Sequence, residues 1–219
     1  MRFPSTAKTT QAQDIDMTQS PVTAQQMDAI REVVNIGAGH AATNLSALTG
    51  LTVMISVPRI QWARSASGAG LPGRGDLVLI TVPITGVSEL GGERAALVLA
   101  TETALRMVAL MLRRDPSRHV EVGELEKSAL MEMGNIVCAA YVGVLGTFLG
   151  KGVMIGTPEM LIGKREELSE QVVNGLVIET DFTFLDTTFE GVFVLSHSDV
   201  SFQSLLSALG FKDVGSATA

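Results

Sequence analysis

Residues 27–40, MDAIREVVNIGAGH, decide the fold because they divide one long helix into two unlike faces. A helix turns by about 100° per residue, so side chains three and four apart share a face. One face is apolar and carries Met27, Ile30, Val34, Ala38, Ala41, Leu45 and Leu48. The other face carries Asp28, Glu32, Asn35 and Gly39. The pattern predicts a helix that packs on one side and presents a polar stripe on the other.

The residues around this stretch mark where the helix begins and ends. Thr23 followed by Gln26 is typical of a capping box, and Gly50 is typical of a C-terminal stop, so the sequence predicts a helix over 24–48. Inside it, Gly37 and Gly39 each cost about 1 kcal/mol relative to alanine. We therefore expect another backbone to come close to this helix.

The same pattern returns 100 residues later in KSALMEMGNIVCAA, residues 127–140. The shift superimposes Glu32 on Glu132, Asn35 on Asn135, Ile36 on Ile136, Gly50 on Gly150, Pro58 on Pro158, and VMI at 53 on VMI at 153. Helix propensity does not require this register, so the chain contains an internal repeat.

Strand and helix patterns follow the same order around both copies. In the first half we expect strands over 51–58, 76–84 and 93–100, a Gly-rich loop over 61–75, and a helix over 101–114 with Thr101 as its cap. A connector over 113–123 precedes a helix over 124–149, a strand over 152–158, a polar segment over 163–171, strands over 172–184 and 188–196, and a final helix over 198–211. Pro58 and Pro158 are expected to end strands.

These elements predict an α/β fold: a pseudo-twofold duplicated unit of about six mostly antiparallel strands, two long motif-bearing helices and two shorter helices. We expect a single domain over 22–212, built from repeats of about 22–114 and 121–212. A disordered N-terminal tail over 1–21 and a C-terminal tail over 213–219 are expected to flank it.

Composition narrows the classes of function. The chain has 219 residues, 46% of them hydrophobic, and a net charge of -7, which disfavours nucleic-acid binding.

Cys138 is the sole cysteine and lies in an apolar run, so a disulfide framework is excluded and a reducing cytoplasm is expected. The apolar run over 137–150 is shorter than the roughly 18 to 20 residues of a membrane span. We expect no membrane segment and no metal site, because His40, His119 and His197 lie in different elements.

Both halves share the spacing Asp/Ser-x3-Glu-x2-Asn-x22-Pro. It is met by Asp28, Glu32, Asn35 and Pro58 in the first half, and by Ser128, Glu132, Asn135 and Pro158 in the second. With its flanking sequence, this pattern resembles the CheC family over about residues 22–212. The family, with its relatives CheX and FliY, comprises phosphatases that act on phosphorylated CheY in bacterial and archaeal chemotaxis, and its fold is a duplicated α/β unit.

The resemblance implies a role for each motif residue. Glu32 and Glu132 would hold the active-site lysine of the response regulator, and Asn35 and Asn135 would orient the attacking water. Asp28 and Ser128 would be accessory. Because an acyl phosphate is already labile, hydrolysis needs a placed water more than a covalent nucleophile, and a neutral amide holds that water without repelling the phosphoryl group. The protein would need no cofactor of its own, since Mg²⁺ would belong to the regulator.

Other interpretations remain open. A Glu and an Asn three apart are commonly just a solvated helix face, and the in-register duplication is what favours a site. The second functional class is a non-catalytic adaptor that binds a response regulator or a CheD-like deamidase. FliY is disfavoured because no FliN-like domain follows residue 212. The segment 13–18, QDIDMT, could tether a regulator, and Trp62 with the loop over 63–75 could form a contact surface.

Overall fold

A computed structural model describes residues 23–63, 70–86, 93–116, 122–172, 175–196, 203–204, 206–207 and 209–211. Its helices are α1 (Ala24–Thr49), α2 (Thr101–Met111), α3 (Glu124–Leu149) and α4 (Arg165–Ser169). Its strands are β1 (Val53–Ala63), β2 (Leu77–Thr85), β3 (Arg94–Ala100), β4 (Met154–Ile155), β5 (Glu159–Gly163), β6 (Gly175–Phe184) and β7 (Thr187–Ser196).

The strands form one seven-stranded sheet with the order β1-β6-β7-β3-β2-β4, and β5 also pairs with β2. Every pairing is antiparallel. Exchanging β1 with β4 and β5, β2 with β6, and β3 with β7 leaves this order unchanged. The duplicated sequence therefore folds into a sheet with twofold order, and the predicted fold class is confirmed.

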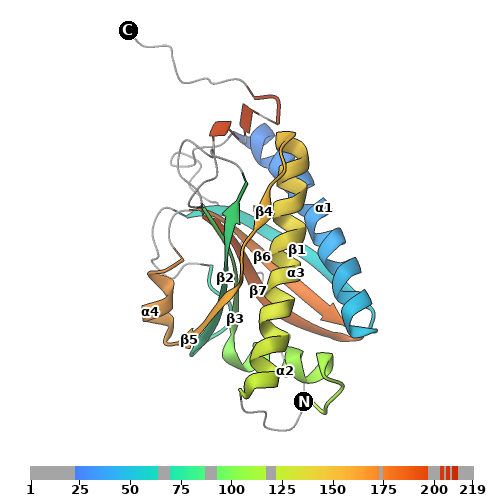
Figure 1. Cartoon of the computed structure of the whole chain (residues 1–219). Coiled ribbons are helices and arrows are strands. Elements are labelled where there is room, and N and C mark those ends of the chain that lie inside the picture. The colour runs from blue at the N-terminus through green and yellow to red at the C-terminus, as the bar shows by residue number, and fades with distance from the viewer. Residues whose placement is uncertain are drawn as a thin grey trace, which may run out of the picture.

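Helices α1 and α3 lie side by side on one face of the sheet and run in opposite directions (Figure 1). The main core lies between them and the sheet, where alternate strand residues such as Val78 and Ile80 are buried. The intervening residues Leu77 and Leu79 belong to a second apolar cluster with Leu168 of α4. Because neighbouring strand residues face opposite sides, this second cluster lies on the other face of the sheet.

The predicted ends of the long helices agree with the structure. The Thr23 backbone N–H donates to Gln26 Oε1 at 2.8 Å, and the Gln26 N–H donates to Thr23 Oγ1 at 3.3 Å, which completes the capping box. Gly50 and Gly150 end α1 and α3 with φ of 67° and 64°, in the left-handed region that favours glycine.

The start of α3 is held by a carboxylate. Glu126 accepts a hydrogen bond from the Gly123 N–H at 3.1 Å and pairs with the Arg114 guanidinium. Hydrogen bonds from backbone N–H groups, its own first, together with Arg114 lower the pKa of Glu126, while burial opposes that shift. This contact ties the segment after α2 to the beginning of the second half.

Gly37 marks the closest approach of the two long helices. A Cβ placed on Gly37 would lie 2.7 Å from Tyr141 Cδ1 and 3.2 Å from Tyr141 Cα. The predicted close backbone is therefore that of α3. Gly39 differs, because a Cβ there would have no heavy atom within 4 Å among the described residues.

Helix α2 begins differently from its prediction. Thr101 is its first residue and Ala100 its N-cap, with no side-chain capping bond, so Thr101 is not the cap. The reason is that β3 ends at Ala100 and runs directly into the helix. The Thr101 hydroxyl is buried and has no hydrogen-bond partner in the described structure.

Within the predicted strand over 152–158, only β4 at Met154–Ile155 is a strand, and a second short strand, β5, follows at Glu159–Gly163. Both β4 and β5 pair with β2, and Pro158 lies between them. Pro58 does not end a strand, since β1 continues through it to Ala63 with a register shift between Ser56 and Arg59. A proline lacks an N–H for the ladder, so it coincides here with an irregularity inside the edge strand.

Three further expectations are corrected. The polar segment over 163–171 contains α4, held to the 70–75 turn by Arg165, which donates to the carbonyls of Pro72 and Gly73 at 2.8 and 2.7 Å. The predicted loop over 61–75 begins as strand, because β1 pairs with β6 up to Ala63. Leu48 is 48% exposed, since the last turn of α1 lies where the two helices have diverged (Figure 1).

Several predicted features lie outside the described residues: the tails over 1–21 and 213–219, the segment 13–18, His119, His197, the Trp62 side chain, and most of the loop over 63–69 and of the final helix over 198–211. Of that last segment, Leu206 is buried and Leu209 and Phe211 pack against the main core.

Helix α3 alone among the described helices is long and apolar enough to cross a membrane, by length and composition. It is a core helix here, because 56% of that apolar window is buried within the protein. A buried core helix commonly has this composition.

The Gly37 contact predicts the effect of a single methyl group. Gly37→Ala would force the new Cβ against Tyr141, so we expect it to lower the free energy of unfolding by about 1 to 3 kcal/mol, as overpacking does. Gly143→Ala is the control, because a Cβ there meets nothing within 4 Å and should be neutral or stabilising. Urea unfolding of both variants gives the comparison. Equal stability of the two variants would contradict the close helix approach.

Candidate functional site

The first motif lies on the outer surface of α1. Asp28, Glu32 and Asn35 are all exposed, and so is Gly39 one turn further on. The buried residues of α1, which include Ile30, Val34 and Ala38, occupy the opposite side of the helix. The two faces predicted from the sequence are therefore both present.

The second motif lies on α3, which is more deeply embedded. Ser128 and Glu132 are exposed, whereas Asn135 is half-buried. Helix α3 contacts α2, β4 and β5 in addition to α1, so its surroundings leave less free surface than those of α1. The two motifs match in sequence and differ in accessibility.

An exposed apolar residue accompanies the first motif and was not singled out from the sequence. Ile36, beside Asn35, is 39% exposed, and its counterpart Ile136 packs against the main core. In the sequence, the place of Ile36 at the boundary between the apolar and polar stripes of the helix was the signal that could have predicted its exposure. Ile36 adds an apolar contact surface to the first motif alone.

The two motifs lie at opposite ends of the helix pair. Each occupies the N-terminal half of its own helix, and the helices run in opposite directions past the Gly37 and Tyr141 contact (Figure 1). Glu32 and Asn35 therefore lie on one side of that contact, and Glu132 and Asn135 on the other. The arrangement defines two separate sites instead of one composite site.

The motif side chains are free of partners within the described structure. No hydrogen bond or ion pair there involves the side chains of Glu32, Asn35, Glu132 or Asn135. Other exposed carboxylates are paired, as Glu124 is with Lys127 at 2.9 Å and Glu159 with Arg94 at 2.8 Å. The amide and carboxylate groups of both motifs are thus available to an external partner.

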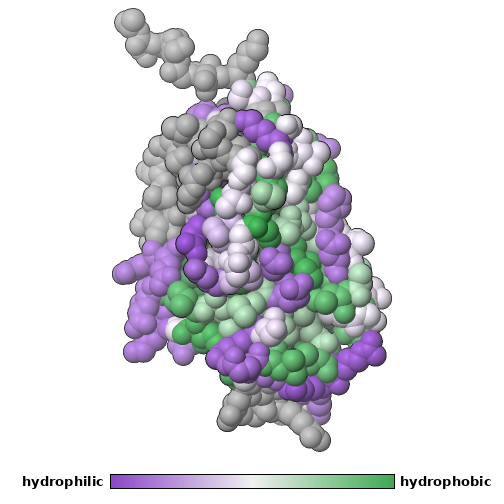
Figure 2. Space-filling view, in the orientation of Figure 1, coloured by the Kyte–Doolittle hydropathy of each residue, from purple (hydrophilic) through white to green (hydrophobic). Residues whose placement is uncertain are grey.

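The outer surface has a mixed character. Figure 2 shows hydrophilic and hydrophobic side chains interspersed over the face that the two helices form. Such a surface suits a protein partner more than a polyanion, which requires a basic face.

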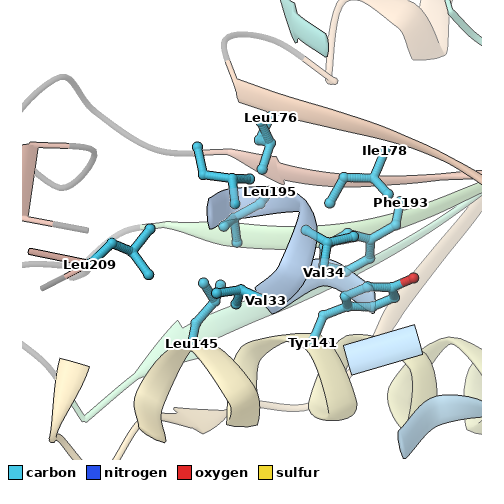
Figure 3. Close-up of a pocket in the computed structure, with 10 residues that line it drawn as sticks. Val33, Val34, Tyr141, Leu145, Leu176, Ile178, Phe193, Leu195 and Leu209 are labelled. Atoms are coloured by element: carbon cyan, nitrogen blue, oxygen red, sulfur yellow. The ribbon is translucent and has the colours of Figure 1, made fainter. Parts of the chain in front are cut away.

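An apolar crevice lies beneath the helices, on the side of α1 opposite the first motif. It is lined by side chains of α1, α3, β6 and β7, with Leu209 at one end (Figure 3). The centre of a water molecule can occupy about 10 Å³ inside this crevice, so the crevice has room for roughly one water. Burial raises the pKa of Tyr141, whose ring lines the crevice, to about 12, although the Thr180 hydroxyl opposes the shift. This crevice belongs to the core and has no catalytic polar groups.

The described residues contain no cluster of three or more His, Cys, Asp or Glu side chains that could hold a metal ion. His40 is exposed on α1. Cys138 is fully buried, and burial raises the pKa of its thiol, so it is a core residue. Neither residue belongs to a ligand set in the part of the chain described.

Comparisons with known proteins agree with this arrangement. The sequence model of the CheC-like family matches residues 26–61 and 125–162, the two segments that carry the motifs and the strands after them. A protein of Bacillus subtilis named CheY-P phosphatase CheC is 25% identical over 199 residues, which cover 85% of this chain and 94% of that protein.

Solved structures share the fold. FliY of Thermotoga maritima superimposes with a TM-score of 0.72 at 21% identity, and the match covers 87% of this chain and 98% of that one. A Helicobacter pylori structure of a FliG–FliM complex matches with a TM-score of 0.57 at 16% identity, and the match covers 85% of this chain and 100% of that one. At these identities the likeness concerns the fold alone.

Fold and motifs together define a duplicated α/β protein that carries one Glu/Asn pair on each of its two long helices. The resemblance predicted from the sequence is confirmed: the CheC-like family model matches one segment in each half of the chain, and CheC of Bacillus subtilis is similar over most of its length.

The motif chemistry predicts how the isolated chain behaves toward metal ions. Because each site offers one carboxylate and one amide, we expect no stoichiometric binding of Mg²⁺ or Zn²⁺ by the full chain alone. Titration calorimetry measures this directly. Tight uptake of one ion per chain would show that a ligand set exists and would contradict the assignment of the metal to a partner.

Proposed function

We propose that this protein hydrolyses the aspartyl phosphate of a CheY-like response regulator in chemotaxis. The observation that carries the proposal is the pair of Glu-x2-Asn motifs on α1 and α3, which have no partner among the described residues and are exposed except at the half-buried Asn135. The relative named CheY-P phosphatase CheC supports the substrate class. The protein would act in the cytoplasm, where such regulators operate.

Each motif would divide recognition and chemistry between two residues. Glu32 or Glu132 would pair with a lysine of the regulator and fix its position, because opposite charges at an interface set the register. Asn35 or Asn135, one helical turn further, would then enter the regulator's site. Asp28 and Ser128, four residues before each Glu, would support the contact.

The amide of Asn suits the placement of a water. It carries a donor and an acceptor but no charge, so it can hold a water in line with phosphorus without repelling the phosphoryl oxygens. Positioning of this kind supplies most of the catalysis of phosphoryl transfer. The protein would need no cofactor of its own, and Mg²⁺ would be held by the regulator's carboxylates.

A second candidate is a non-catalytic adaptor. It is favoured by the likeness to FliM, one solved structure of which is a complex with FliG. In this case the same outer surface of α1 and α3 would bind a response regulator or a CheD-like deamidase and leave the phosphate intact. Phosphate release separates the two candidates.

Asparagine substitutions test the proposed mechanism. Asn35→Ala and Asn135→Ala singly should each leave measurable phosphatase activity, because the other site remains. The double variant should reduce dephosphorylation to the regulator's own rate. Phosphate release from the phosphorylated regulator, with wild type and all three variants, gives the result.

Native circular dichroism serves as the control for folding. Asn35 is exposed, where alanine changes stability by no more than about 0.5 kcal/mol, and the half-buried Asn135 side chain has no hydrogen-bond partner in the described structure, so the double variant should remain folded. Full activity of the folded double variant would remove the asparagines from the mechanism. Loss of all activity in one single variant would mean that only one site works.

A further inference from the structure

Gly39 lies one turn beyond Asn35 on the face of the first motif, and no contact in the described structure requires it to be glycine. It is inside α1, where glycine is unfavourable relative to alanine. It does not have a positive φ, and a Cβ at this position would meet nothing within 4 Å among the described residues. Its carbonyl accepts a hydrogen bond from the Thr43 hydroxyl at 2.9 Å, so the backbone is satisfied there.

The contrast with Gly37 sharpens this point. Gly37 is buried and lies against Tyr141, where a Cβ would come within 2.7 Å of the ring. Two residues later, the same helix exposes Gly39 to open space. The protein itself therefore explains Gly37 and leaves Gly39 unexplained.

The position of Gly39 supplies the second observation. It follows Asn35 by four residues and Glu32 by seven, which places it within about 40° of both around the helix. Gly39 thus continues the exposed stripe that contains the Glu and Asn of the first site. In the second site the corresponding residue is the exposed Ala139, so the two stripes differ there by one methyl group.

We propose that Gly39 is a positioning residue: its bare surface lets the backbone of the bound regulator come close enough for Asn35 to reach the phosphoryl group. The inference rests on the proposed function and adds a difference between the sites. Ala139 holds the partner further from Asn135, so the first site binds the regulator more tightly than the second.

The chain contains a matched control. Gly143 is also an exposed glycine inside a long helix, with nothing within 4 Å of a Cβ and with a carbonyl that accepts from the Thr147 hydroxyl at 3.1 Å. It lies about 80° around α3 from Asn135, outside the motif stripe. Gly143→Ala therefore repeats the chemical change of Gly39→Ala away from either site.

The experiment isolates one site at a time in the full chain. Gly39→Ala is placed in a background that carries Glu132→Lys and Asn135→Ala, which leaves the first site alone. Ala139→Gly is placed in the reciprocal background of Glu32→Lys and Asn35→Ala. The affinity for beryllofluoride-loaded regulator, the KM and kcat for phosphate release, and the melting temperature are measured for each variant and for Gly143→Ala.

We expect Gly39→Ala to raise the melting temperature and yet weaken regulator affinity about tenfold, with a matching rise in KM. Ala139→Gly should do the reverse: a lower melting temperature with tighter binding at the second site. Gly143→Ala should raise the melting temperature and leave affinity unchanged. A purely structural role of Gly39 would not make stability and affinity move in opposite directions.

The outcomes separate this inference from the proposed function. Gly39→Ala with a higher melting temperature and unchanged affinity and KM would overturn the role of Gly39, whatever the activity. A protein that binds the regulator but never releases phosphate would overturn the proposed hydrolysis, and a tenfold loss of affinity in Gly39→Ala would still support close approach. A wild-type protein that binds no regulator would overturn both.

Discussion

The close contact between α1 and α3 is the constraint on which the rest of the arrangement depends. Gly37 allows the Tyr141 ring and backbone to come against α1, which fixes the two long helices on one face of the sheet. Because the helices run in opposite directions, the contact also fixes which surfaces face outward. The outward surfaces carry Glu32 with Asn35 and Glu132 with Asn135. Packing thus places two candidate sites on the two copies of one repeated helix.

Duplication explains why the sites can differ without loss of the fold. The sheet order is unchanged when the halves are exchanged, yet each helix has its own neighbours. Asn35 is exposed beside Ile36 and Gly39, whereas Asn135 is half-buried near Ala139. Most of the free energy of folding lies in the shared core, so the outer surfaces are free to diverge. A duplicated chain can therefore keep the same Glu and Asn in both halves while the two pairs differ in their exposure to solvent.

Much of the fold could be predicted from the sequence because helix ends and the internal repeat are visible in the sequence itself. Caps at Thr23, Gly50 and Gly150, and the 100-residue repeat, gave the two long helices within a residue of their observed ends. The features that could not be predicted from the sequence depend on tertiary contacts. Strand β5 forms because it pairs with β2, which is far away in the sequence. The half-burial of Asn135 depends on the other elements that pack around α3, and no local sequence pattern identifies them. The repeated motif gave the candidate site residues, but only the structure distinguishes Gly37, which packs, from Gly39, which does not.

The central claim is that the glutamates of both motifs hold the response regulator. The most direct measurement is the affinity of beryllofluoride-loaded regulator for the chain with Glu32→Lys and Glu132→Lys. A control of equal charge carries Glu102→Lys and Glu190→Lys, at exposed positions outside α1 and α3. We expect binding at least about tenfold weaker for the motif variant than for the control, because lysine would face lysine. Equal affinity of the two variants would contradict it.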